Sequence, residues 1–157
     1  MKVKERTAHV HAPRFDLDRF LPYRLARLSA ALSAEFARVY GARHGISAPE
    51  WRVLAHLSQE DGLSVREIHA RAGMDKPKIS RAAARLVAAG LASKKAGADR
   101  RLVSLTLTEA GRTLIEDLVP HAREFERRAL SPLSEDEARA FSALIDKLIA
   151  AGASPRP

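Results

Sequence analysis

The sequence predicts a mainly α-helical fold with one small β-hairpin, and three observations lead to this prediction. Apolar residues recur every three or four positions through most of the chain, which is the period of an amphipathic helix. Capping residues open these periodic segments, and glycines follow several of them. After residue 102 the period changes to alternation, which is typical of a half-buried strand.

The composition limits the class of protein. A chain of 157 residues favours one domain, or one compact core with helical extensions. The absence of cysteine excludes disulfides and thiolate metal sites, and it fits a reducing compartment. There is no run of about 18 apolar residues to span a membrane, and the N-terminus lacks the apolar region of a secretory signal. We therefore expect a cytoplasmic protein with no membrane partner.

The first helix is predicted to begin near Leu21 and to end at Gly41 and Gly45. Pro22 fits only in the first turn of a helix, so residues 16–20 lead into it. Its apolar face is spaced by threes and fours: Leu21, Leu25, Leu28, Leu32, Phe36 and Val39.

Three shorter helices are predicted between residues 47 and 90. Ser47 with Glu50 and Ser64 with Glu67 have the spacing of capping boxes, and Asp75 caps the third helix. The helices end before Asp61-Gly62, at Gly73 and at Gly90. In the third helix the predicted buried stripe is Ile79, Ala83, Leu86 and Val87.

A hairpin and two further helices complete the chain. The alternation of Val103, Leu105 and Leu107 with polar residues predicts a half-buried strand, which pairs with the short run at residues 91–95. Thr108 caps the next helix, in which Pro120 predicts a kink or a break. Ser134 and Glu137 form the capping box of the last helix.

Positive charge is concentrated in the centre of the sequence. The net charge is +8 overall, but residues 64–107 alone carry 10 Lys or Arg against 3 Asp or Glu. Such a stretch suits a polyanion, either nucleic acid or an anionic membrane surface. None of the eight aromatic residues lies in this stretch, so it lacks the stacking platforms of single-strand and RNA binders. We therefore favour double-stranded DNA as the partner.

The central helices and hairpin have the order of a winged helix-turn-helix. In such a unit the second helix enters the DNA major groove and the hairpin forms a wing. The expected DNA contacts of the recognition helix are Lys76, Pro77, Lys78, Ser80, Arg81 and Arg85. Arg81 suits a bidentate contact to guanine, whereas Arg85, a turn farther on, suits a phosphate. Ala82 and Ala84 would leave room for close approach to the groove.

The wing supplies a second set of expected contacts. Lys94 and Lys95 on its first strand would face phosphates, and Arg100 or Arg101 at its tip would enter a narrow minor groove. Asp99 would hold one of these arginines in a fixed rotamer. The alternative for each charged residue is a solvated surface position without a DNA contact.

Six segments together resemble the MarR family of winged helix-turn-helix transcriptional regulators, over roughly residues 20–150. They are Trp51-Arg52-Val53-Leu54, Ser64-Val65-Arg66-Glu67-Ile68, Asp75-Lys76-Pro77-Lys78-Ile79-Ser80-Arg81, Leu86-Val87-Ala88-Ala89-Gly90-Leu91, Asp99-Arg100-Arg101 and Leu107-Thr108-Glu109-Ala110-Gly111. The resemblance implies a homodimer that binds a pseudo-palindromic operator, with repression as the default. It also divides the chain into an N-terminal arm (1–15), an N-terminal dimerisation helix (16–46), the winged helix-turn-helix (47–107), C-terminal dimerisation helices (108–151) and a tail (152–157).

The resemblance further implies a small-molecule effector, bound between the dimerisation helices and the winged helix. An aromatic or phenolic carboxylate, or its CoA thioester, is the expected class, and Tyr23, Arg27, Trp51 and His56 are the candidate pocket residues. Arg27 would face the carboxylate. The alternative assigns these four residues to the core, to caps and to the surface.

An enzyme is the main rival class. The sequence contains no G-x-S-x-G, P-loop, G-x-G-x-x-G or H-E-x-x-H pattern. We therefore expect no catalytic residue, no cofactor and no metal. The alternative within DNA binding is a ligand-independent architectural protein with little sequence preference.

Overall fold

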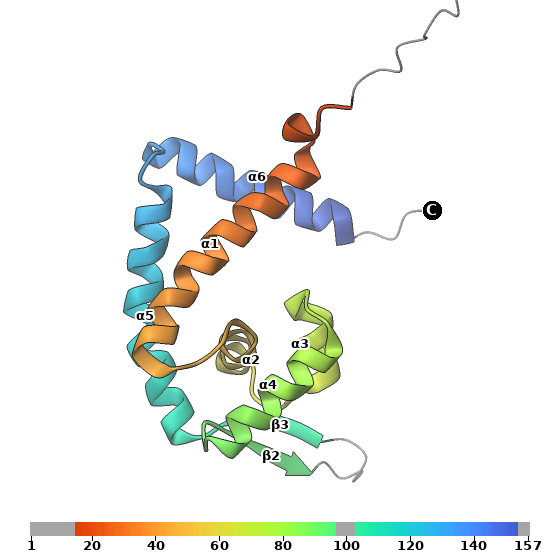
Figure 1. The fold of residues 1–157 in the computed structure, drawn as a ribbon, viewed down its shortest axis with the longest axis vertical. Helices are drawn as coiled ribbons and strands as arrows, with labels where there is room; N and C mark the ends of the chain where they lie inside the picture. The colour runs from red at the N-terminus through yellow and green to blue at the C-terminus, as the bar shows by residue number, and fades with distance from the viewer. Residues whose placement is uncertain (1–14, 97–102, 154–157) are drawn as a thin grey trace, which may run out of the picture.

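The computed structural model describes residues 15–96 and 103–153. The described elements follow in this order (Figure 1): η1 (Leu17–Arg19), α1 (Leu21–His44), α2 (Ala48–Gln59), β1 (Leu63–Ser64), α3 (Val65–Ala72), α4 (Lys76–Ala88), β2 (Ala92–Ala96), β3 (Val103–Leu107), α5 (Glu109–Leu130) and α6 (Glu135–Ala153). The predicted mainly helical fold with a hairpin wing is confirmed. Within the described ranges, no helix is both long and apolar enough to cross a membrane.

Two regions are visible along the long axis of the molecule (Figure 1). Helices α2, α3 and α4 gather around the small sheet at one end, and α6 crosses α1 at the other end. Helix α5 runs along one side from the sheet to α6 and connects the two regions. The DNA-binding unit expected from the sequence is thus separated from the terminal helices expected to dimerise.

The sheet has three antiparallel strands in the order β1-β3-β2. The predicted hairpin of β2 and β3 is confirmed, with Lys94 opposite Leu105. Strand β1 was not predicted, because its two residues are too few to show a period and Ser64 was identified only as a helix cap. Strand β1 pairs with the edge of β3 that β2 leaves free, and Leu63 lies opposite Leu105.

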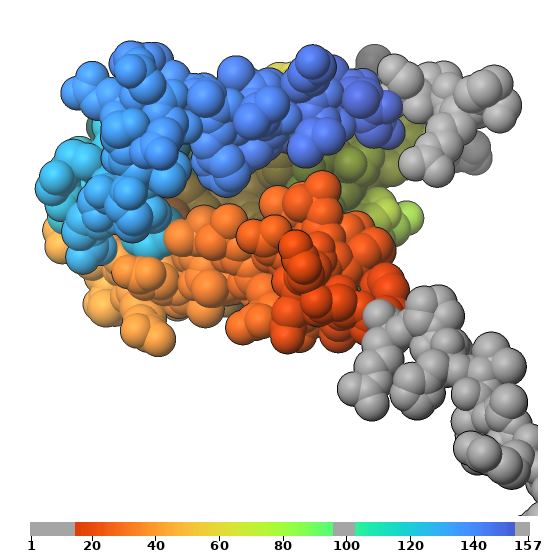
Figure 2. Space-filling view, turned by 90° about the horizontal axis from the view of Figure 1, so that it is seen from above, coloured from red at the N-terminus to blue at the C-terminus, as the bar shows by residue number. Residues whose placement is uncertain are grey.

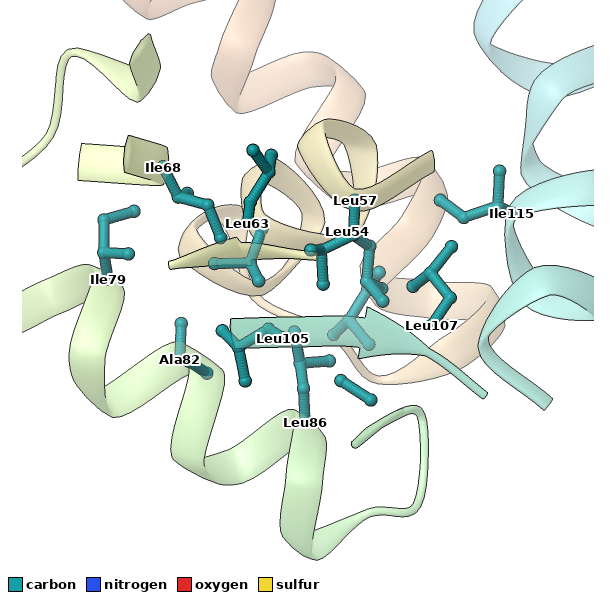
Figure 3. Packing of buried hydrophobic residues seen from close by; sticks show 14 of the residues in the cluster. Leu54, Leu57, Leu63, Ile68, Ile79, Ala82, Leu86, Leu105, Leu107 and Ile115 are labelled. Atoms are coloured by element: carbon teal, nitrogen blue, oxygen red, sulfur yellow. The ribbon is translucent and has the colours of Figure 1, made fainter. Parts of the chain in front are cut away.

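The core fills the space between the sheet and helices α2, α3 and α4 (Figure 3). Its fully buried large side chains come from each of these elements: Val53, Leu54, Leu63, Ile68, Ile79, Leu86, Leu105 and Leu118, the last from α5. The predicted alternation of β3 holds for Leu105 and Leu107 but is wrong for Val103, which is 43% exposed, and for Thr106, which is buried. The Thr106 hydroxyl is hydrogen-bonded to the Ser93 hydroxyl at 2.9 Å, so its burial leaves no unsatisfied group.

The predicted capping residues fix most helix starts. The Ser64 backbone N–H donates to the Glu67 carboxylate at 2.7 Å, and Glu67 N–H donates to the Ser64 hydroxyl at 3.2 Å. Ser134 with Glu137 repeats this arrangement, and Thr108 accepts from the N–H of Gly111. Asp75 occupies the N-cap position of α4, but the expected side-chain capping bond is absent, and its carboxylate is instead paired with Lys78 at 3.0 Å.

Two predicted helix breaks are wrong. Helix α1 continues through Gly41 and ends at Gly45, whose φ of 64° supplies the left-handed turn. Of the kink or break predicted at Pro120, the break is wrong, because α5 runs as one helix from Glu109 to Leu130. Proline removes only one backbone hydrogen bond, and packing on both sides of it, by buried Leu118 and by Phe125 against Phe36, stabilises the helix.

Gly111 allows the wing to meet α5. A Cβ at this position would lie 2.0 Å from the Leu91 carbonyl oxygen. That carbonyl accepts the Thr108 N–H at 3.2 Å, and the Thr108 hydroxyl donates to the Gly90 carbonyl at 2.6 Å. These contacts join the start of α5 to the end of α4 and the start of the wing. Gly111 is required there because no side chain fits at its position.

Candidate DNA interface and ligand cavity

Helix α4 has one buried face and one exposed cationic face. All six residues predicted to contact DNA are exposed: Lys76, Pro77, Lys78, Ser80, Arg81 and Arg85. Ile79, Ala83 and Leu86 are buried as predicted, and Val87 is half-buried. The role given to Ala82 is wrong, because it is 0% exposed and lies on the core face three residues after Ile79 and four before Leu86. Ala84 is exposed and remains beside the cationic residues.

Ion pairs distinguish the four cations of this face. Lys78 pairs with Asp75 on the same helix end, and Arg85 pairs through Nε with Glu50 of α2 at 2.8 Å. Lys76 and Arg81 form no ion pair with any described residue. Arg81 therefore combines a central position on the exposed face with a guanidinium that forms no ion pair with a described residue, which leaves its donors available for a base contact.

The Glu50 carboxylate is charged and well satisfied. Burial raises its pKa, but hydrogen bonds from Ser47 and Arg85 outweigh this and hold the pKa below its ordinary value. The Ser47 backbone N–H donates to Oε2 at 2.7 Å, which forms part of the predicted capping box. The pairing of Glu50 with Arg85 was not predicted, since the two residues are 35 positions apart.

The first wing strand carries its two lysines on opposite faces. Residues paired in register share a face, so Lys94 lies on the face of Leu105 and Lys95 on that of Ser104. Both lysines are exposed, although they do not point in one direction. The predicted tip contacts Asp99, Arg100 and Arg101 lie outside the described residues.

A cavity of about 290 Å³ lies between α1, α2 and α3. Its aromatic wall is built from contacts between Trp51, Tyr40 and Phe36, whose rings lie 5.2 to 5.7 Å apart. The lining residues are Ser33, Phe36, Tyr40, Ala48, Trp51, Arg52, Ala55, His56, Arg71 and Ala72.

The polar wall of the cavity is cationic. Arg52 donates to the Ala72 carbonyl at 2.6 Å, and Arg71 pairs with Glu60 at its rim. Burial lowers the pKa of His56, and the charges of Arg71 and Arg52 lower it further. The combination of aromatic surface and positive charge suits an aromatic anion.

The four predicted pocket residues do not lie together. Trp51 and His56 line the cavity, whereas the half-buried Tyr23 and the exposed Arg27 are in the first two turns of α1. The Arg27 guanidinium lies 5.7 Å from the centre of the Tyr23 ring and pairs with Asp18 at 3.6 Å. Arg52 and Arg71 were not predicted as cavity residues. The spacing of an arginine in a helical sequence is the same whether its side chain faces solvent or a cavity.

An apolar groove separates α1 from α6. Figure 2 shows the two helices as separate ridges with a hollow between them. The groove has a volume of about 460 Å³ and is lined mainly by Leu25, Leu28, Leu32, Phe141, Ile145, Leu148 and Ile149. Much of the apolar surface of α6 is exposed, including 64% of Ile149 and 59% of Leu144.

Comparison with known proteins identifies the family. The sequence model of the MarR family matches residues 44–102. The HTH-type transcriptional repressor Rv2887 of Mycobacterium tuberculosis is 30% identical over 129 residues, which are 82% of this chain and 92% of the repressor. The chain belongs to the MarR family. The resemblance inferred from the six sequence segments is confirmed, and this MarR-family protein is a DNA-binding transcriptional regulator.

Solved structures agree with this assignment. A MarR/EmrR family regulator from Acinetobacter sp. ADP1 superposes with a TM-score of 0.77 at 28% identity, covering 87% of this chain and 96% of that one. Bordetella bronchiseptica BpsR superposes with a TM-score of 0.74 at 26% identity, covering 82% and 97%. The DNA binding of BpsR is regulated by 6-hydroxynicotinic acid.

Proposed function

We propose that this MarR-family regulator is a homodimeric repressor that binds a pseudo-palindromic operator and is released by a small aromatic anion. The observation that carries the proposal is the exposed cationic face of α4, directly opposite the buried stripe that fixes the helix in the core. The arrangement leaves a rigid helix available to the major groove. The wing follows it, with Lys94 and Lys95 toward phosphates and Arg100 or Arg101 toward a minor groove.

Arg81 is the proposed base-reading residue of α4. It lies two turns before the end of the helix and has no competing ion pair among the described residues. Lys76, Lys78 and Ser80 flank it on the exposed surface, and Pro77 presents apolar surface that suits a thymine methyl group. Base contacts from this face would give the sequence preference that distinguishes a repressor from an architectural protein.

A second copy of the chain is the proposed occupant of the apolar surface of α1 and α6. Contiguous exposed apolar patches of this kind mark interaction sites in soluble proteins. A two-fold dimer would place the two recognition helices about one DNA turn, roughly 34–36 Å, apart. Such spacing would require an operator with two inverted half-sites.

The cavity beside Trp51 is the proposed effector site. Its volume of about 290 Å³ suits a single-ring acid, with the ring against Trp51 and the carboxylate toward Arg52 and Arg71. The aromatic acyl group of a CoA thioester would also stack against Trp51, but its carboxyl group is a neutral thioester, so its negative charge would lie on the nucleotide phosphates outside the cavity. The regulation of BpsR by 6-hydroxynicotinic acid supports this ligand class. Release from DNA would follow if the ligand stabilised a spacing of α4 helices that does not match the operator.

The test is a gel-shift titration on the DNA flanking the protein's own gene, with random-sequence duplex as competitor. Specific binding that 6-hydroxynicotinate, benzoate or an aromatic CoA thioester releases would support the full proposal. Specific binding that none of them changes would contradict the effector site. Equal binding to both duplexes would indicate the architectural alternative.

A variant test addresses Arg81. Arg81→Ala should cost about 1–3 kcal/mol of operator binding and relax the preference at one base position. Arg38→Ala removes an exposed arginine of α1 and serves as the matched control. Unchanged operator affinity in Arg81→Ala would remove Arg81 from base recognition.

A further inference from the structure

We infer that Glu50 is a positioning residue for DNA binding: it holds Arg85 by its Nε and presents the rest of the guanidinium to a backbone phosphate. The inference rests on the proposed function in one respect, namely that the exposed face of α4 meets duplex DNA. It concerns a contact that does not depend on base sequence. It assigns a DNA-binding role to α2, a helix outside the helix-turn-helix.

The two partners differ in exposure. The Glu50 side chain is 12% exposed and that of Arg85 is 55% exposed. Glu50 Oε1 accepts the Arg85 Nε–H at 2.8 Å, and Oε2 accepts the backbone N–H of Ser47 at 2.7 Å. The carboxylate is thereby fixed to the first turn of α2, while most of the guanidinium remains accessible.

The pair should persist when DNA binds. If Arg85 moved away, Glu50 would remain as a largely buried carboxylate without its cation, which is a costly arrangement. A guanidinium has five N–H donors, and this pair uses the one on Nε. The four on Nη1 and Nη2 have no acceptor among the described residues. Arg85 can therefore donate two parallel bonds to a phosphate without leaving Glu50.

The pairing of Lys78 shows the contrast. Lys78 and Asp75 lie three residues apart on one helix end, with side chains 54% and 72% exposed. Such an exposed pair contributes little and exchanges freely with solvent or phosphate. Among the described cations of α4, only Arg85 is paired with another helix. Its orientation is therefore set before DNA arrives, which lowers the entropy lost on contact.

The test compares Glu50→Gln, Arg85→Ala and the double variant in titrations against a random-sequence duplex over a range of salt concentrations. In Glu50→Gln the side-chain amide oxygen can still accept the Ser47 N–H, so the cap of α2 is retained while the charge on Arg85's partner is lost. Arg85→Ala should lower affinity and reduce the slope of log affinity against log salt by about one. Glu50→Gln should lower affinity severalfold in the wild-type background and have no further effect in Arg85→Ala. Asp75→Asn is the matched control and should not weaken binding.

Four outcomes would overturn the inference. Tighter binding by Glu50→Gln would mean that Glu50 repels the phosphate, and an equal loss in the Arg85→Ala background would mean that it acts through the fold. An unchanged salt slope in Arg85→Ala would remove the phosphate contact. Absence of duplex binding by the wild type would overturn both proposals, whereas binding without operator preference would defeat only the repressor proposal.

Discussion

The winged-helix core and the terminal helices use similar apolar residues in opposite ways. In the core, Leu54, Ile68 and Leu105 are at most 1% exposed, and each is surrounded by side chains from several elements. In α6, Leu144, Leu148 and Ile149 are more than half exposed, although their spacing is just as regular. Periodicity therefore establishes that a face is apolar, but it does not show whether that face is covered by its own chain or by another.

The largest expected effect tests whether the exposed face of α6 is covered by a second copy. Ile145→Glu should abolish dimerisation at micromolar concentrations, because it would bury an unpaired carboxylate in the interface. Sedimentation velocity measures the change. Ala143→Glu, on the opposite side of α6, adds the same charge and should leave the dimer intact. Identical sedimentation of both variants and wild type would contradict an interface at this groove.

The next effect addresses the core. Leu105→Ala should reduce the free energy of unfolding by about 2–5 kcal/mol, because Leu105 is buried in the middle strand and a cavity would remain. Urea denaturation at several protein concentrations, with each variant and the wild type compared at the same concentration, measures it. Leu144→Ala in α6 is the control, and its effect should depend on protein concentration whereas that of Leu105→Ala should not. A loss below about 1 kcal/mol for Leu105→Ala would mean that the sheet adjusts to fill the space.

A smaller effect compares two similar helix caps. Ser64→Ala should cost about 1 kcal/mol, because α3 unfolds together with the core. Ser134→Ala removes a cap of the same geometry from α6, which makes few contacts with its own chain. In an Ile145→Glu background, Ser134→Ala should not shift the urea midpoint of the core. An equal shift for both serines would show that α6 unfolds with the core even in the monomer.

The smallest effect is a pH dependence at the cavity between the two regions. Burial and the nearby arginines lower the pKa of His56 in the folded protein below its ordinary value of about 6.5. As the pH falls below about 6.5, His56 therefore binds a proton in the unfolded chain before it does so in the folded protein. The free energy of unfolding should decrease with falling pH, with a slope smaller than that for the uptake of one full proton. His56→Gln should remove this part of the pH dependence in urea titrations between about pH 5 and 7. An unchanged profile would mean that His56 is solvated in the folded state.

The local features of the fold were largely determined by the sequence itself. Ser64, Thr108 and Ser134 cap helices where their spacing with later residues predicts, and Gly45, Gly73 and Gly90 adopt positive φ at predicted helix ends. Each of these depends on groups within a few residues of one another. The cationic face of α4 was predictable for the same reason, since residues three and four apart share one side of a helix.

Other features were decided only by tertiary contacts. Glu50 and Arg85, Leu63 and Leu105, and the cavity cations Arg52 and Arg71 come together only when α2, α3, α4 and the sheet pack. Packing also keeps α5 helical at Pro120, although proline in a helix interior costs about 3 kcal/mol. Packing of α4 against the core likewise decides that Ala82 is buried. The sequence thus determined where the helices begin, which faces are apolar and where charge is concentrated. The tertiary structure decided which charges are paired, which apolar faces are covered and where a ligand can fit, because those depend on distances between segments far apart in the chain.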